Sequence, residues 1–178
     1  MLTKEQLLSP LAALRGDAVV VTTMGMVRPW GHYSYSDLDF ASADSAMGHA
    51  ADLALGIALA QPGRKVICLN GDGSMLMTLG TLVTAVQAGA TNLILFVIEN
   101  GTYEITGNQP VPGTGFVDFA AMARAAGFSR TLSSARSLEG ERRERANHRI
   151  TSVTVKTNKN QQTALPKKFF CIAVAVRL

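Results

Sequence analysis

The chain is poor in the features that mark several large protein classes. Only two of its 178 residues are cysteines, 17% are charged and 6% are aromatic. Cys68 and Cys171 lie far apart in apolar runs, which excludes a disulfide framework and a zinc-ligand spacing and favours reduced thiols in the cytoplasm. No apolar run approaches the roughly 18 residues that span a bilayer, and no signal-peptide pattern opens the chain. We therefore expect a cytoplasmic protein without a membrane segment.

Charge and glycine are distributed unevenly along the chain. Residues 1–128 hold 6 Lys and Arg against 10 Asp and Glu, whereas residues 129–178 hold 11 against 3. Fifteen of the 16 glycines lie before residue 128. The basic end lacks the aromatic-interleaved stripe of a nucleic-acid-binding module. We expect no nucleic-acid partner there, and favour docking to an acidic protein surface.

Apolar patterning predicts an α/β protein with a parallel sheet. Apolar and β-branched runs predict buried strands, whereas helical spacing of apolar residues predicts the segments between them to be helices. Strands that alternate with helices are typical of a three-layer parallel sheet with helices on both faces. The region between the first strand and the second helix is rich in polar, aromatic, Gly and Pro residues and predicts a long loop. The expected strands are 18–23, 65–69 and 92–99, the helices 4–14, 47–60, 74–88 and 117–126, and the loop 24–44.

A glycine-rich turn follows the second predicted strand, where open parallel sheets bind ligands. Gly71 and Gly73 allow the backbone to approach a ligand closely, and Ser74 offers a hydroxyl at the start of the next helix. Asp72 would repel a bare phosphate, but a divalent cation between the carboxylate and the phosphate removes that conflict. The turn therefore predicts a phosphate site that contains Mg²⁺.

The third predicted strand ends in a second turn, Asn100-Gly101-Thr102. Adjacent strand ends can bring the Asp72 carboxylate, the Asn100 amide oxygen and the Thr102 carbonyl to one ion. Gly-Asp-Gly and Asn-Gly are both common turn sequences when they occur alone. Their combination, with 26 residues between Gly73 and Asn100, is far more specific for a diphosphate–Mg²⁺ site.

This combined pattern resembles the signature of thiamine diphosphate enzymes, in their diphosphate-binding domain. The resemblance extends over about residues 3–128 and implies thiamine diphosphate and Mg²⁺ as cofactors. It implies that Met47 is the apolar residue beneath the cofactor, that the Ser45 carbonyl accepts from its amino group, and that the loop containing Gly25 contacts the diphosphate. The resemblance also implies cofactor contacts by the two turns. These residues are Gly71, Asp72, Gly73, Ser74, Asn100, Thr102 and Tyr103, with Asp72, Asn100 and Thr102 on the metal.

Residues 71–74, 99–101 and 106–110 most resemble phosphonopyruvate and sulfopyruvate decarboxylases. The resemblance implies a 2-oxo acid substrate and a heteromer, because the family's activating glutamate belongs to a pyrimidine-binding domain that 178 residues do not also hold. We expect a pyrimidine-binding alpha subunit as partner, and self-association through the diphosphate-binding domain. A carboligase subunit like that of acetolactate synthase, and a non-catalytic cofactor-binding scaffold, remain alternatives.

Three further residues are candidate catalytic groups. His32 lies in the long predicted loop and could contact substrate or pack against a partner. His49 could shuttle protons in the cleft or lie on a helix that meets a partner. Glu104, like Tyr103, follows the metal turn and either acts in the site or holds the loop in place. Met75 and Met77 are interpreted as core residues.

The C-terminal part of the sequence is less regular. Residues 137–148 predict a surface helix and residues 150–156 an edge strand, both with counterparts in the family, so the expected domain is 1–156. Residues 157–178 form an atypical extension. Its apolar run, 169–176, could be an added strand, part of an interface, or non-native sequence produced by a frameshift.

Overall fold

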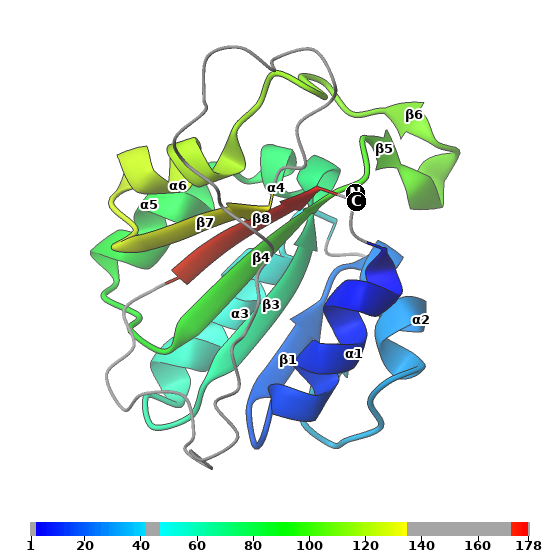
Figure 1. The fold of residues 1–178 in the computed structure, drawn as a ribbon. Coiled ribbons are helices and arrows are strands. Elements are labelled where there is room, and N and C mark those ends of the chain that lie inside the picture. The colour runs from blue at the N-terminus through cyan, green and yellow to red at the C-terminus, as the bar shows by residue number, and fades with distance from the viewer. Residues whose placement is uncertain (1–2, 42–46, 135–171, 178) are drawn as a thin grey trace, which may run out of the picture.

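A six-stranded parallel sheet forms the centre of the molecule (Figure 1). The structure is a computed structural model that describes residues 3–41, 47–134 and 172–177. The strand order is β2-β1-β3-β4-β8-β7, and each neighbouring pair is parallel. The strands are β1 Val19–Thr22, β2 Asp39–Ala41, β3 Val66–Gly71, β4 Leu93–Glu99, β7 Arg130–Ser134 and β8 Ile172–Arg177.

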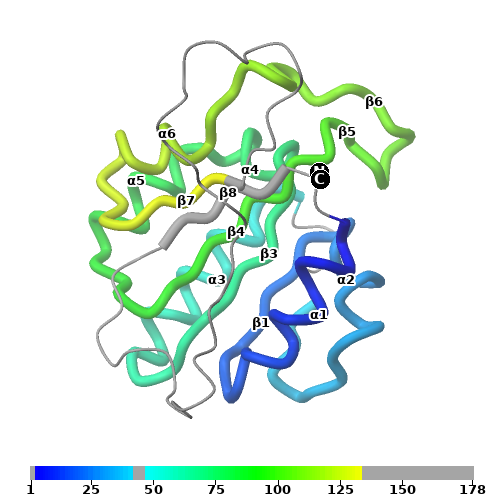
Figure 2. The backbone as a smooth tube through the Cα atoms, in the orientation of Figure 1, coloured from blue at the N-terminus to red at the C-terminus, as the bar shows by residue number. Residues whose placement is uncertain are grey.

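Helices cover both faces of the sheet, as Figures 1 and 2 show. Val20 and Ile67 pack on one face with side chains of α1 (Lys4–Leu14) and α2 (Met24–Gly31). Their chain neighbours Val21 and Cys68 pack on the other face. The helices there are α3 Ala50–Ala60, α5 Gly80–Gln87 and α6 Phe119–Ala126. Because successive strand residues point to opposite faces, the near-continuous apolar strands supply two cores. The predicted three-layer α/β architecture is confirmed.

The prediction of one long loop over 24–44 is wrong in part. Residues 24–31 form α2 and residues 39–41 form β2, which pairs with β1. Met26 and Trp30, four residues apart, bury their side chains on one face of α2. That burial outweighs the breaking tendency of Pro29, whose missing N–H removes one helical hydrogen bond.

Two predicted helices have different bounds in the structure. The segment 74–88 is divided into α4 (Asp72–Met77) and α5, because Thr78 has a non-helical backbone and donates its hydroxyl to the Gly48 carbonyl at 2.6 Å. α3 begins at Ala50 instead of residue 47, and Gly48 before it has a φ of +84°. This left-handed conformation favours glycine and keeps 47–49 outside the helix.

The C-terminal strand β8 lies between β4 and β7 (Figure 1). This placement agrees with the added-strand alternative for the run 169–176. β7 had no predicted counterpart. The predicted helix 137–148, the strand 150–156 and the domain boundary after 156 lie outside the described residues. Among the helices that the structure describes, none is long and apolar enough to cross a membrane.

Candidate functional site

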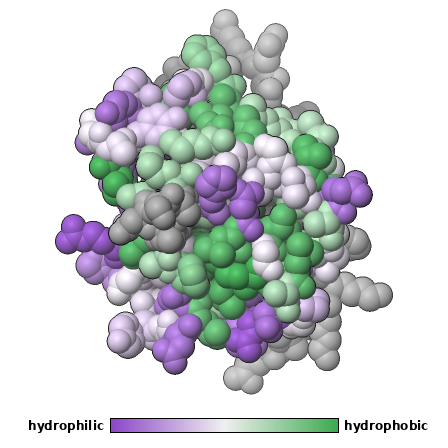
Figure 3. Space-filling model, turned by 180° about the vertical axis from the view of Figure 1, so that it is seen from behind, coloured by the Kyte–Doolittle hydropathy of each residue, from purple (hydrophilic) through white to green (hydrophobic). Residues whose placement is uncertain are grey.

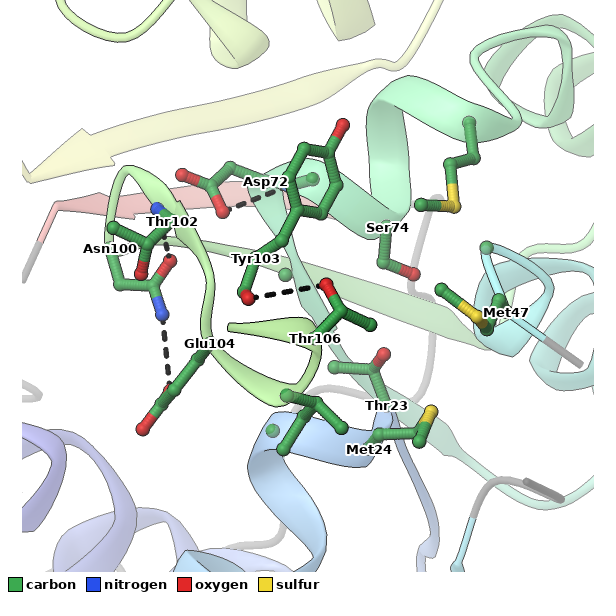
Figure 4. Close-up of a pocket in the computed structure, with 16 residues that line it drawn as sticks. Thr23, Met24, Met47, Asp72, Ser74, Asn100, Thr102, Tyr103, Glu104 and Thr106 are labelled. Carbon is green, nitrogen blue, oxygen red and sulfur yellow. Dashed lines mark hydrogen bonds between the residues drawn. The ribbon is translucent and has the colours of Figure 1, made fainter. Parts of the chain in front are cut away.

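A pocket opens where β1, β3 and β4 end, at the carboxyl edge of the sheet (Figure 4). Four separate segments line it, and they come from the ends of these strands and the turn before α3. Figure 4 places Asp72, Asn100 and Thr102 on one side of the pocket and Met47 on the opposite side. The lining residues are Thr23, Met24, Gly25, Met47, Gly48, Gly71, Asp72, Gly73, Ser74, Met77, Asn100, Thr102, Tyr103, Glu104, Ile105 and Thr106.

Asp72 joins the two glycine-containing turns. Its side chain is buried, Oδ1 accepts a hydrogen bond from the Gly73 amide at 2.8 Å, and Oδ2 accepts from the Gly101 amide at 2.8 Å. Burial raises the pKa of Asp72, and backbone amide donors oppose part of that rise. A cation close to the carboxylate would compensate the remaining cost of its charge.

Asn100 lies in the turn that Asp72 contacts. Its Oδ1 accepts from the Thr102 amide at 3.1 Å, and its Nδ2 donates to Glu104 Oε2 at 3.2 Å. Gly101 has a φ of +73°, which a side-chain-bearing residue rarely adopts, so glycine suits this sharp turn. The turn thus brings an amide oxygen and the Thr102 carbonyl to the segment that binds the Asp72 carboxylate.

The oxygen atoms of this region fit Mg²⁺ better than a transition metal. One carboxylate, one amide and one carbonyl are hard ligands, and Mg²⁺ is commonly held by one or two carboxylates together with phosphate oxygens. No group of three or more His, Cys, Asp or Glu side chains that could hold a metal occurs among the described residues. A metal here would therefore need ligand oxygens from a bound group such as a diphosphate.

Ser74 and Gly73 fit an anionic ligand. The Ser74 hydroxyl oxygen is buried but has no hydrogen-bond partner among the residues that the structure describes, so its donor is available to a ligand oxygen. A Cβ atom on Gly73 would come within 2.5 Å of Cε1 in the Tyr103 ring. Only glycine at 73 lets this ring pack so closely on the turn.

Tyr103 and Glu104 both line the pocket and also hold its walls together. Tyr103 packs on Gly73, whereas the Glu104 carboxylate forms an ion pair with Lys4 Nζ at 3.0 Å. The short strands β5 (Thr102–Tyr103) and β6 (Gln109–Pro110) pair on either side of a 3-10 turn, η1 (Glu104–Thr106). The predicted loop-holding role is therefore visible in the contacts, and a role in chemistry stays a prediction.

Two further residues that the resemblance assigns to the cofactor line the pocket, and a third lies outside the described residues. Met47 lines the pocket with 46% of its surface exposed. Gly25 also lines it, and a Cβ there would lie 3.7 Å from Glu104 Oε2. Ser45 lies outside the described residues.

Neither candidate histidine lines this pocket. His49 precedes α3, and its Nδ1 lies 2.7 Å from Asp52 Oδ2. His32 caps the end of α2 and lines a second, neighbouring pocket. Spacing along the chain placed both near the correct strand ends, but it does not determine where their side chains lie.

Several lining residues were not predicted, and Met77 was predicted wrongly. Met75 is buried in the core as expected, whereas Met77 is 46% exposed and lines the pocket. Residues two apart on a helix point to different sides, which could have distinguished them. Thr23 and Met24 directly precede Gly25, in the loop that the resemblance places against the diphosphate. Gly48 directly follows the predicted Met47, and Thr106 begins the segment 106–110 that carries the resemblance, whereas Ile105 had no sequence signal.

Comparisons with known proteins agree on one family. Residues 23–155 match the thiamine pyrophosphate enzyme C-terminal TPP binding domain. Phosphonopyruvate decarboxylase from Streptomyces viridochromogenes is 40% identical over 119 residues, which are 66% of this chain and 29% of that protein. Sulfopyruvate decarboxylase subunit beta from Methanothermobacter thermautotrophicus is 43% identical over 84 residues, 47% of this chain and 44% of that one.

A similarity in fold extends over almost the whole chain. The crystal structure of benzoylformate decarboxylase from Polynucleobacter necessarius superimposes with a TM-score of 0.66 at 18% identity, covering 99% of this chain and 33% of that one. The matched part spans less than half the length of the two curated relatives. Because the family match covers well over half of the chain, the protein belongs to the thiamine pyrophosphate enzymes and contains their C-terminal TPP-binding domain.

Proposed function

We propose that this chain is the thiamine diphosphate- and Mg²⁺-binding subunit of a 2-oxo acid decarboxylase of the phosphonopyruvate or sulfopyruvate class. The contact of the Asp72 carboxylate with the Gly101 amide carries this proposal. It joins the two turns whose oxygens suit a metal–diphosphate group. The names of the two curated relatives support the substrate class, since both act on a pyruvate that bears an acidic group.

Each residue would have a distinct task toward the cofactor. Asp72, Asn100 and the Thr102 carbonyl would hold Mg²⁺, and Ser74 would donate its free hydroxyl to a diphosphate oxygen. Met47 would pack against the organic part from the opposite wall. Bound thiamine diphosphate supplies the electron sink that lets carbon dioxide leave a 2-oxo acid. The chain itself binds, orients and neutralises the diphosphate.

The active site would be completed by a partner. The expected activating glutamate belongs to a pyrimidine-binding subunit, and the name of one relative, a beta subunit, supports such a division between chains. Self-association through this domain is also part of the proposal. Exposed apolar side chains such as Leu59 and Val83 support it, and Figure 3 shows apolar surface gathered on the face behind that of Figure 1.

The proposal is tested with the purified chain and a pyrimidine-binding partner mixed with thiamine diphosphate and MgCl₂. Release of carbon dioxide and an aldehyde from phosphonopyruvate or sulfopyruvate is the expected result. Formation of an acetohydroxy acid would support the carboligase alternative, and no turnover would support the scaffold. The chain without partner should be inactive, and steady turnover by it would contradict the division of the site between two chains.

A further inference from the structure

A second pocket adjoins the cofactor pocket, between α1, α2 and η1. It shares four lining residues with the first: Met24, Gly25, Glu104 and Ile105. Its remaining wall differs in charge, because Lys4, Arg28 and His32 line it, whereas none of the described residues that line the first pocket is Lys, Arg or His. A molecule that reacts in the first pocket could therefore place an anionic group in the second pocket.

The cations of the second pocket are not equally available. Lys4 Nζ lies 3.0 and 3.2 Å from the two Glu104 oxygens, and Asn100 also donates to Glu104. The charge of this carboxylate is thus already compensated. The side chains of Arg28 and His32 form no hydrogen bond or ion pair with any residue that the structure describes. The available positive charge therefore comes from α2.

The end of α2 is fixed by a buried cluster on its other side. Asp39 accepts from Trp30 Nε1 at 2.9 Å and forms an ion pair with Arg15. Arg15 Nη2 also donates to the Ala18 carbonyl at 2.8 Å, next to β1. Because Trp30 lies between Arg28 and His32 in the sequence, this cluster holds both residues on a rigid support.

We infer that Arg28, assisted by His32, binds the second acidic group of the substrate, a phosphonate or a sulfonate. The inference rests on the proposed function. In such a substrate the acidic group is one methylene away from the reacting carbonyl, which suits two pockets that share a wall. A guanidinium binds tetrahedral oxyanions through two parallel hydrogen bonds. Arg28 is then a specificity-determining residue that selects acidic 2-oxo acids over pyruvate.

The kinetic test compares Arg28→Gln with wild type in the assembled enzyme. The ratio of kcat/KM for phosphonopyruvate, or for sulfopyruvate, to kcat/KM for pyruvate should fall at least tenfold, mainly through KM. Arg28→Lys should retain part of the ratio. Arg124→Gln is the matched control, since Arg124 donates to Thr131 on the far face of the sheet. The acidic substrate whose kcat/KM ratio falls more identifies the preferred oxyanion. An unchanged ratio for both acidic substrates overturns the inference.

A binding test on the full chain does not depend on turnover. Phosphonoacetate should move the His32 ring resonances in NMR spectra, acetate should not, and Arg28→Gln should weaken the response at least tenfold. His49 serves as internal control, and His32→Asn assigns the signal. Unmoved His32 resonances in wild type overturn the inference. An assembled enzyme without turnover would overturn the proposed function instead, and the His32 response would then decide whether the pocket binds an oxyanion.

Discussion

Asp72 combines burial with a tight set of amide donors. Both carboxylate oxygens accept a backbone N–H at 2.8 Å, yet burial still raises the pKa. The folded chain without a cation therefore binds the Asp72 proton more tightly than a free aspartate does. The Asp72 side chain thus suits a site in which a cation arrives together with a ligand.

This shift has a predictable effect on stability. A folded pKa above the ordinary 3.8 means that the folded state binds the proton more tightly. The Asp72 contribution is therefore most favourable below the unfolded pKa and is lost as pH rises through the raised folded pKa. Without metal, the free energy of unfolding of wild type should fall relative to Asp72→Asn as pH rises through that window. Urea titrations at several pH values measure this, and a difference that changes in the opposite direction would contradict it.

The Tyr103 ring packs closely against Gly73. Gly73→Ala would place a Cβ 2.5 Å from the ring, so the ring or the turn must move. We expect the affinity for thiamine diphosphate to fall at least tenfold, with a circular dichroism spectrum like that of wild type. Gly56→Ala is the matched control, because Gly56 lies in α3 outside the pocket and a Cβ there would meet nothing within 4 Å. Equal affinity losses in both variants, measured by calorimetry in the assembled complex, would refute the role of this contact.

The sequence predicted correctly that polar residues from two strand ends would lie together. The structure brings Asp72, Asn100 and Thr102 to one pocket, because parallel strands end at the same edge. Their metal-binding roles stay predictions. His32 and His49 lie outside that pocket, since the direction of a side chain depends on packing that spacing alone does not encode.

Among the elements, α2 departs most from the prediction. Its Gly and Pro residues favour a loop, but Met26 and Trp30 pack into a buried apolar cluster beside β1. That core is formed by residues distant in the sequence, so local propensity could not reveal it. The break between α4 and α5 has a similar origin, since Thr78 donates a hydrogen bond to the carbonyl of Gly48, which is distant in the sequence.

The Arg15–Asp39 pair should contribute strongly to the stability of this region. Arg15 is buried, and Asp39 is the acidic group paired with it. Asp39→Ala leaves a buried guanidinium without its counter-charge, so we expect the free energy of unfolding to fall by about 3 kcal/mol. The exposed Asp37 provides the control, and Asp37→Ala should change stability by less than about 0.5 kcal/mol. Similar urea midpoints for both variants would show that the cluster contributes little.

At the scale of the whole molecule, the strand pattern and the match of residues 23–155 support the same fold. The three central strands and their helices were predictable, because strands buried on both faces have near-continuous apolar sequences. The position of β8 between β4 and β7 was not, since pairing across so long a chain separation leaves no local pattern. The part of this chain that matches spans 29% and 44% of the two curated relatives, and the completion of the active site by a partner stays a proposal.

Asp72 and the Asn100 turn are proposed to bind a divalent cation together with a diphosphate. Electron paramagnetic resonance of Mn²⁺ added to the chain with thiamine diphosphate tests this binding most directly. We expect one bound Mn²⁺ per chain that depends on the cofactor and is lost in Asp72→Asn. Mn²⁺ binding of equal strength in wild type and Asp72→Asn would contradict it.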